Sequence, residues 1–294
     1  MKTGLIKVSL TSEQDRYQTV FRALDQIFEE ASGLIYRLDP QKDYILLKPN
    51  CISANALAST HVDALKAVLD FLQPIWQGRV ILAEGSGLGN TLTAFKNLHY
   101  LDLKPMFPKL EFLDLNYSES IFVTGFAPDL QPQQLRLSAT VAQAPLRISV
   151  SPPKTHESVI VTLSIKNMAI GALLKEDKPK IHQGPRAINR TIAGLYKSTF
   201  PHLAILDGWV SMEGRGPVSG KPKETHFALA STDALAADTL TTEIMGFNPN
   251  EIGYLNLLGA KEIDPQICVV GENSDDFKTK FKPPEDYLNQ LKWQ

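Results

Sequence analysis

Cysteine is scarce in this chain: only Cys51 and Cys268 occur among its 294 residues. Two thiols are too few for a disulfide framework, for a zinc site made of cysteine thiolates or for a four-cysteine iron–sulfur cluster. The sequence therefore predicts that no iron–sulfur cluster is bound and that any metal would be held by other side chains.

Long apolar runs and an excess of basic charge are also missing. No stretch of about 18 apolar residues is available to span a bilayer, and the first residues, MKTGLIKVSLTSEQD, carry no apolar secretion signal. The formal net charge is −2, which gives no overall positive field for nucleic acid or an anionic membrane. We therefore expect a cytoplasmic protein that binds neither nucleic acid nor membrane; its oligomeric state is left open.

Short apolar runs alternate with amphipathic helical patterns along the chain, which predicts an α/β fold with a largely parallel sheet and crossover helices. Strands are expected at residues 5–10, 44–48, 79–84, 110–115, 146–150, 203–207, 227–231 and 267–270. Helices are expected over residues 15–31, 61–72, from 91, and over 188–199, 233–245 and 249–259. The pattern weakens between 117 and 145 into a proline-containing stretch typical of a junction. We predict two α/β lobes, 1–145 and 146–294, the second ending in an irregular arm.

Polar residues follow the apolar runs directly. Because open parallel sheets bind ligands at the carboxyl ends of their strands, we expect a cleft there for a small anion. The ligand-binding residues predicted from these positions are Lys48, Asn50, His61, Glu84, Gly85, Ser86, Gly87 and Thr155. The glycines of the loop 84–91 would let backbone N–H groups approach the anion at a helix N-terminus, although Asn90 stands where a dinucleotide fingerprint needs glycine.

The segment 154–167, KTHESVIVTLSIKN, holds the densest set of candidate catalytic groups. Lys154 and Lys166 would supply positive charge for a phosphate or carboxylate. His156, expected on an exposed loop and kept neutral by a neighbouring ammonium, could act as an acid, a base or a metal ligand. A solvated lysine pair and a capping histidine explain the same pattern. Both a strand and a helix would put Thr162 and Lys166 on one face.

Acidic residues in the second half suggest a divalent metal. Asp207, Asp233 and Asp238 could bind Mg²⁺ or Mn²⁺, which prefer oxygen ligands, while Glu213 could share the acid–base work. Alternatively, Asp233 caps the following helix, and Asp238 lies about 140° around that helix from it.

The segment 175–190 is rich in basic residues broken by proline and glycine: Lys178, Lys180, His182, Arg186 and Arg190. Such a segment is typical of a solvated loop. The alternative is a mobile lid that delivers cations to the ligand.

Taken together, several motifs resemble the family of domain of unknown function 362. They are LLKPN (46–50), AEGS (83–86), PKTH (153–156), TLSIKNMAIG (162–171), LDGWVSMEGRGPVSG (206–220) and ASTDALAADTLTTEIMG (230–246). The resemblance covers roughly residues 44–260 and implies that Asn167, Gly216 and Gly220 belong to the ligand-binding set. Many relatives carry a ferredoxin-like cluster module, whose cysteines this chain lacks. A looser similarity to the nickel-pincer lactate racemases implies acid–base or metal-cofactor chemistry in a cleft.

Two functions are compatible with these residues. The first is an enzyme acting on a small phosphate- or carboxylate-bearing metabolite, in which lysines hold the anion and His156 transfers a proton, with possible metal assistance from the acids. The second is a non-catalytic protein that binds or carries a cofactor or metal for other enzymes. The sequence names neither the substrate nor the reaction.

Overall fold

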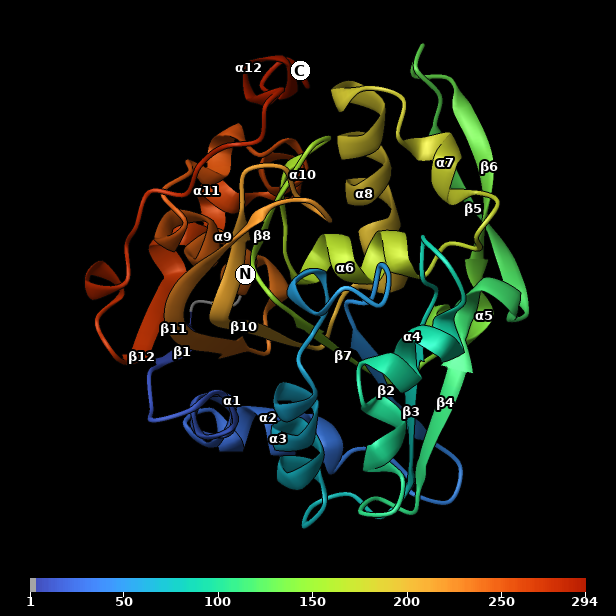
Figure 1. Ribbon diagram of the computed structural model, residues 1–294, viewed down its shortest axis with the longest axis vertical. Coiled ribbons are helices and arrows are strands. Elements are labelled where there is room, and N and C mark those ends of the chain that lie inside the picture. Colours follow the sequence, from blue (N-terminus) through green and yellow to red (C-terminus); the bar gives the residue numbers. More distant parts are fainter. Residues whose placement is uncertain (1–3) are drawn as a thin grey trace.

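Aliphatic runs of the sequence form the strands of a large mixed sheet. The computed structural model describes residues 4–294 (Figure 1). The strands are β1 (Ile6–Thr11), β2 (Tyr44–Pro49), β3 (Arg79–Glu84), β4 (Leu110–Asp114), β5 (Ser120–Phe126), β6 (Pro132–Ser138), β7 (Leu146–Ser151), β8 (Lys154–His156), β9 (Ile160–Thr162), β10 (Leu203–Glu213), β11 (Lys221–Ser231) and β12 (Ile267–Gly271). The helices are α1 (Arg16–Asp25), α2 (Phe28–Ile35), α3 (Val62–Leu72), α4 (Thr91–Asn97), α5 (Ala139–Ala142), α6 (Ser164–Gly171), α7 (Lys178–Ile181), α8 (Pro185–Thr199), α9 (Ala234–Ile244), α10 (Gly253–Leu258), α11 (Ala260–Ile263) and α12 (Tyr287–Gln290).

The main sheet has the strand order β12-β1-β11-β10-β7-β2-β3-β4, with β8 pairing on β10 and β9 on β8. The neighbours β10, β7, β2, β3 and β4 are all parallel, and β12 is parallel to β1. Only β11 runs antiparallel to its two neighbours along this path. The predicted α/β fold with a largely parallel sheet and crossover helices is therefore confirmed.

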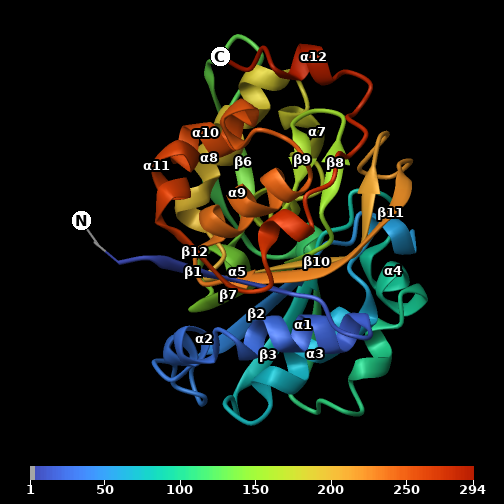
Figure 2. The same cartoon turned by 90° about the vertical axis from the view of Figure 1, so that its left-hand side faces the viewer.

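Helices cover both faces of the sheet (Figure 2). Helices α1 and α3 lie on one face, and α8 and α9 on the other. Strand β2 shows how the sequence produces this: Ile45 and Leu47 belong to one apolar core and Leu46 to the other, all fully buried. Since successive side chains of a strand point to opposite faces, a strand buried on both faces is apolar without interruption.

The structure differs from the predicted elements in several places. The expected helix 15–31 is two helices, α1 and α2. Strands β10 and β11 extend past 207 and start before 227, forming a long antiparallel pair with a bulge between Gly208 and Val210. The stretch 117–145 contains the separate β5–β6 hairpin.

The division into lobes 1–145 and 146–294 stays a prediction. In the sheet, strands from the two ranges are direct neighbours, β2 beside β7 and β1 beside β11. The irregular C-terminal arm packs back onto the fold through Gln290, which is buried, donates to Glu157 O at 2.8 Å and accepts from Ile160 N. The arm therefore braces the turn between β8 and β9.

Candidate functional site

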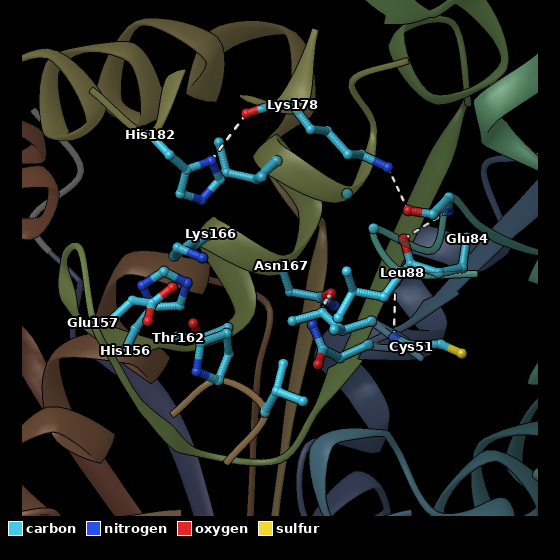
Figure 3. Close-up of a pocket in the computed structure, with 18 of the residues that line it drawn as sticks. Cys51, Glu84, Leu88, His156, Glu157, Thr162, Lys166, Asn167, Lys178 and His182 are labelled. Carbon is cyan, nitrogen blue, oxygen red and sulfur yellow. Dashed lines mark hydrogen bonds between the residues drawn. The ribbon is translucent and has the colours of Figure 1, made fainter. Parts of the chain in front are cut away.

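A cavity of about 700 Å³ opens where β2 and β3 end. Helices α6 and α7 and the β10–β11 connection, residues 215–219, form its other walls. Its polar lining, most of it labelled in Figure 3, consists of Asn50, Glu84, His156, Glu157, Thr162, Lys166, Asn167, Lys178, His182, Arg215 and Ser219. The expected cleft at the strand carboxyl ends is thus present, and it gathers residues from both halves of the sequence.

Lys48 and Glu84 form a buried ion pair at the base of the site. The Lys48 Nζ donates to Glu84 Oε2 at 2.8 Å, to Asn167 Oδ1 at 3.1 Å and to Pro49 O at 3.1 Å. An ammonium has three N–H donors, so the protein satisfies all of them. Glu84 also accepts from Cys51 N at 3.0 Å and from Gly85 N at 2.8 Å. This pair therefore holds β2 and β3 together, and the Lys48 ammonium has no donor left for a ligand.

Lys154 contacts the cavity only through Asn50. Its Nζ donates at 2.5 Å to both Asn50 Oδ1 and Ala58 O, while Asn50 Nδ2 donates to Asn167 Oδ1 at 3.0 Å. Burial lowers the pKa of Lys154 to about 7. Lys154 thus fixes the Asn50 amide, which does line the cavity.

Lys178, in helix α7, lines the cavity, although the sequence of its segment is typical of a solvated loop. Its buried Nζ donates to Gly85 O and, at 3.0 Å, to Asn116 Oδ1. Burial lowers its pKa to about 8. By contrast, the half-exposed Lys180 on the same helix pairs with Asp177 at 2.5 Å. The solvated-loop interpretation is therefore wrong for Lys178, whereas His182 is exposed and also lines the cavity.

Lys166 differs from these lysines because its Nζ has no protein partner. It is only 5% exposed, and no hydrogen bond or ion pair joins it to any residue between 4 and 294 for which the structure gives coordinates. Burial, reinforced by the charge of Lys154, lowers its pKa to about 7. Among residues 4–294, Thr162 Oγ1 also has no partner, and it is buried in the cavity wall. The cavity therefore presents a buried amine and a buried hydroxyl that a ligand could engage.

His156 and His182 lie next to each other, with ring centroids 6.1 Å apart, and Lys166 lies beside both (Figure 3). His156 Nδ1 accepts from Ser158 N at 3.0 Å, so its neutral ring carries the proton on Nε2. His182 Nδ1 lies 2.9 Å from Lys178 O, a carbonyl that can only accept, so its ring carries the proton on Nδ1. The two Nε2 atoms are therefore a donor and an acceptor.

Burial is the main cause that lowers the pKa of both imidazoles, and the charge of Lys166 lowers both further. The pKa of His156 falls well below its ordinary value. Both rings are neutral at pH 7. The expectation that His156 lies on an exposed loop is corrected: it is 2% exposed, in the short strand β8. His156 Nδ1 accepts the hydrogen bond from Ser158 N, while the same ring lines the cavity and keeps its Nε2–H available.

Several predicted ligand residues do not line the cavity because they hold neighbouring loops. Ser86 donates to Cys51 O at 2.7 Å and Thr155 to Gly214 O at 3.0 Å. Gly216 packs so tightly that a Cβ would lie 1.9 Å from Thr155 O. Gly220 packs against Met212 in the same way. Thr155, Gly216 and Gly220 shape the β10–β11 connection, whereas Gly85 and Gly87 line the cavity.

Polar residues at three strand ends cap helices instead. His61 accepts from Asp63 N at 3.2 Å at the start of α3, and Asp233 from Ala236 N at 3.0 Å at the start of α9. Asn90 accepts from Thr93 N at 2.9 Å and starts α4, which has only seven residues. The loop 84–91 therefore contributes Gly85 and Gly87 to the cavity wall. It does not form an anion site at the N-terminus of α4.

The remaining acids serve separate elements. Asp207 accepts from Arg16 at 3.2 Å, Glu213 from Lys282 N at 3.0 Å, and Asp238 from Ser164 N and Ile165 N, each at 2.9 Å. Between residues 4 and 294, no three His, Cys, Asp or Glu side chains gather in a way that could hold a metal ion. The structure thus does not bring the predicted Mg²⁺ or Mn²⁺ ligands together.

Comparison with known proteins agrees with the motif resemblance. Residues 45–243 match the family described as "Domain of unknown function (DUF362)". The chain belongs to this family. A curated relative, "Thylakoid-associated protein sll1697" of Synechocystis, is 28% identical over 252 residues, and the match covers 83% of this chain and 75% of the relative.

Among solved structures, the lactate racemase apoprotein from Thermoanaerobacterium thermosaccharolyticum superimposes with a TM-score of 0.51 at 16% sequence identity. The match covers 79% of this chain and 55% of the racemase, so the chain spans little more than half of that protein. This likeness concerns the fold.

Among residues 4–294, no helix is both long enough and apolar enough to cross a membrane. The cytoplasmic location stays a prediction.

Proposed function

We propose that this DUF362 protein is an enzyme that binds a small carboxylate- or phosphate-bearing metabolite in the cavity and moves a proton on it. The observation that carries the proposal is an excess of buried positive charge. Four buried lysines, Lys48, Lys154, Lys166 and Lys178, lie around the cavity, whose lining carries two carboxylates, the buried Glu84 and the exposed Glu157. Because an uncompensated buried charge is costly, an anion beside Lys166 would supply counter-charge beyond that of Glu84 and Glu157.

The two imidazoles support proton transfer. His156 Nε2–H can donate and His182 Nε2 can accept, and both rings are neutral near pH 7 because burial lowers their pKa. General acid–base catalysis needs a donor and an acceptor within reach of one ligand. A ligand whose anionic group pairs with Lys166 would lie beside both rings.

Sulfate titration by calorimetry tests the binding step, since sulfate keeps its charge across the useful pH range. A charge-assisted hydrogen bond contributes about 1.5–3 kcal/mol, so Lys166→Met should weaken sulfate binding by about tenfold or more. Lys180→Met is the matched control, because Lys180 is half-exposed on α7 and pairs with Asp177. Equal sulfate affinity of Lys166→Met and the wild type would remove the basis of the proposal.

Deuterium incorporation tests the catalytic step. A panel of small carboxylates and phosphate esters in D₂O should contain a compound whose C–H signal is lost with the wild type but not with His182→Gln, which removes the proton acceptor. Native mass spectrometry would then show whether each variant retains the compound. A compound that stays bound through purification but never exchanges a proton would favour the non-catalytic carrier.

A further inference from the structure

We propose that Lys166 is a nucleophile whose Nζ forms an imine with the carbonyl carbon of a small aldehyde or ketone that also carries a carboxylate. This inference rests on the proposed function, because the same cationic cavity has to bind the carboxylate. It narrows the ligand class from small anions to carbonyl-bearing anions.

The first argument is the availability of a lone pair. Lys48 donates to three acceptors, and Lys154 and Lys178 donate to two each, so hydrogen bonds to surrounding oxygens already engage these three groups. Lys166 donates to none of the residues in the described range 4–294, and it lines the cavity. Lys166 can therefore lose a proton without breaking a hydrogen bond, and a carbonyl carbon can reach its nitrogen.

The second argument is the environment of the amine. Desolvation and a neighbouring cation both favour the neutral form of a lysine, and these conditions activate lysine nucleophiles. Lys166 has both, with Lys154 as the cation, and its pKa falls to about 7. A much larger fraction of the Lys166 amines is then neutral at pH 7 than for a lysine of ordinary pKa, for which it is less than about 0.1%.

The third argument is the pair of imidazoles, which can handle the protons of the reaction. The Nζ lone pair bonds to the carbonyl carbon as the C=O π electrons move to oxygen, giving a carbinolamine. The C–O bond then breaks and the nitrogen lone pair closes the C=N bond, so both protons of the neutral amine leave with the oxygen as water. His182 Nε2 can accept a proton from Nζ and, as an imidazolium, return it to the oxygen, while the His156 Nε2–H can donate a hydrogen bond to that oxygen.

Reductive trapping of the full-length protein tests the inference. Glyoxylate, an aldehyde with a carboxylate, is added with sodium cyanoborohydride, whose hydride reduces C=N to a stable amine, and the modified residue is mapped by peptide mass spectrometry. We expect one adduct, on Lys166, formed about tenfold faster at pH 7 than any surface adduct. Glyoxylate label that falls only on surface lysines, with Lys166 unmodified, would overturn the inference.

Two variants test whether the adduct requires Lys166, and a second aldehyde tests whether it requires the carboxylate. Lys166→Met should lose the fast adduct, and Lys180→Met should keep it. Should Lys166→Met fail to fold, the wild-type peptide map still decides. Propionaldehyde, which lacks a carboxylate, should label Lys166 more slowly than glyoxylate.

The same experiments separate this inference from the proposed function. Sulfate binding without a Lys166 adduct would leave the anion site standing and refute the imine. Equally fast labelling by propionaldehyde, with no sulfate binding, would support the nucleophile and refute the anion site.

Discussion

Replacing Glu84 by glutamine isolates the energetic role of the buried pair with Lys48. Glu84→Gln keeps the side-chain shape but removes the charge that faces the Lys48 ammonium at 2.8 Å in a fully buried position. Removing one partner of a buried pair costs about 3–5 kcal/mol. Alternatively, Lys48 can lose its proton in the folded protein. At pH 7 this costs about 4.6 kcal/mol, because each pH unit below the ordinary lysine pKa costs about 1.4 kcal/mol. Both routes predict a loss of about 3–5 kcal/mol in the free energy of unfolding.

Urea denaturation of Glu84→Gln, Lys48→Met and the double variant measures this loss and its cause. The double variant should recover much of the stability, because replacing both partners by apolar groups is often nearly neutral. Burial already lowers the pKa of Lys48, and without Glu84 its folded state releases the proton first. The unfolded state then binds more protons, so the deficit of Glu84→Gln should shrink as pH rises from 7 toward 10. A deficit that is independent of pH, or additive in the double variant, would refute the reasoning.

Three further predictions follow from single contacts. Gly216→Ala should destabilise by about 1–3 kcal/mol in urea denaturation because its Cβ would overlap Thr155 O, whereas Gly33→Ala, with open space around it in α2, should stabilise by up to about 1 kcal/mol. Sulfate affinity should fall, in calorimetry, as pH rises through about 7 to 8, because Lys166 then loses its proton. Asp238→Asn should lower the free energy of unfolding by about 2–4 kcal/mol, since an amide cannot accept the hydrogen bonds of Ser164 and Ile165 equally well.

The main strands could be predicted from the sequence because an apolar run is a local signal. Strand β3 is the run RVILAE, and its burial on both faces follows from its composition alone. The segment 154–167 could not be resolved in this way. Its polar and apolar residues fit a strand and a helix period equally, and the structure uses both, a β8–β9 hairpin followed by α6.

Residues with the same local sequence signal ended in different environments. Lys178 and Lys180 lie in one basic segment, yet only Lys178 is buried. Its acceptors, Gly85 O and Asn116 Oδ1, are 93 and 62 positions away along the chain. Burial of a charged side chain therefore depends on partners that only the folded chain brings together, and no local pattern could have separated these two lysines.

Asp238 shows how one such distant contact builds the site. Its carboxylate is fully buried and accepts from Ser164 N, Ser164 Oγ and Ile165 N, 73 and 74 positions away, at the start of α6. An acid at a helix N-terminus satisfies N–H groups that the helix leaves unpaired, although burial raises the pKa of Asp238 to about 7. Because Lys166 lies in the first turn of α6, the carboxylate expected to bind a metal fixes the helix end that carries the amine.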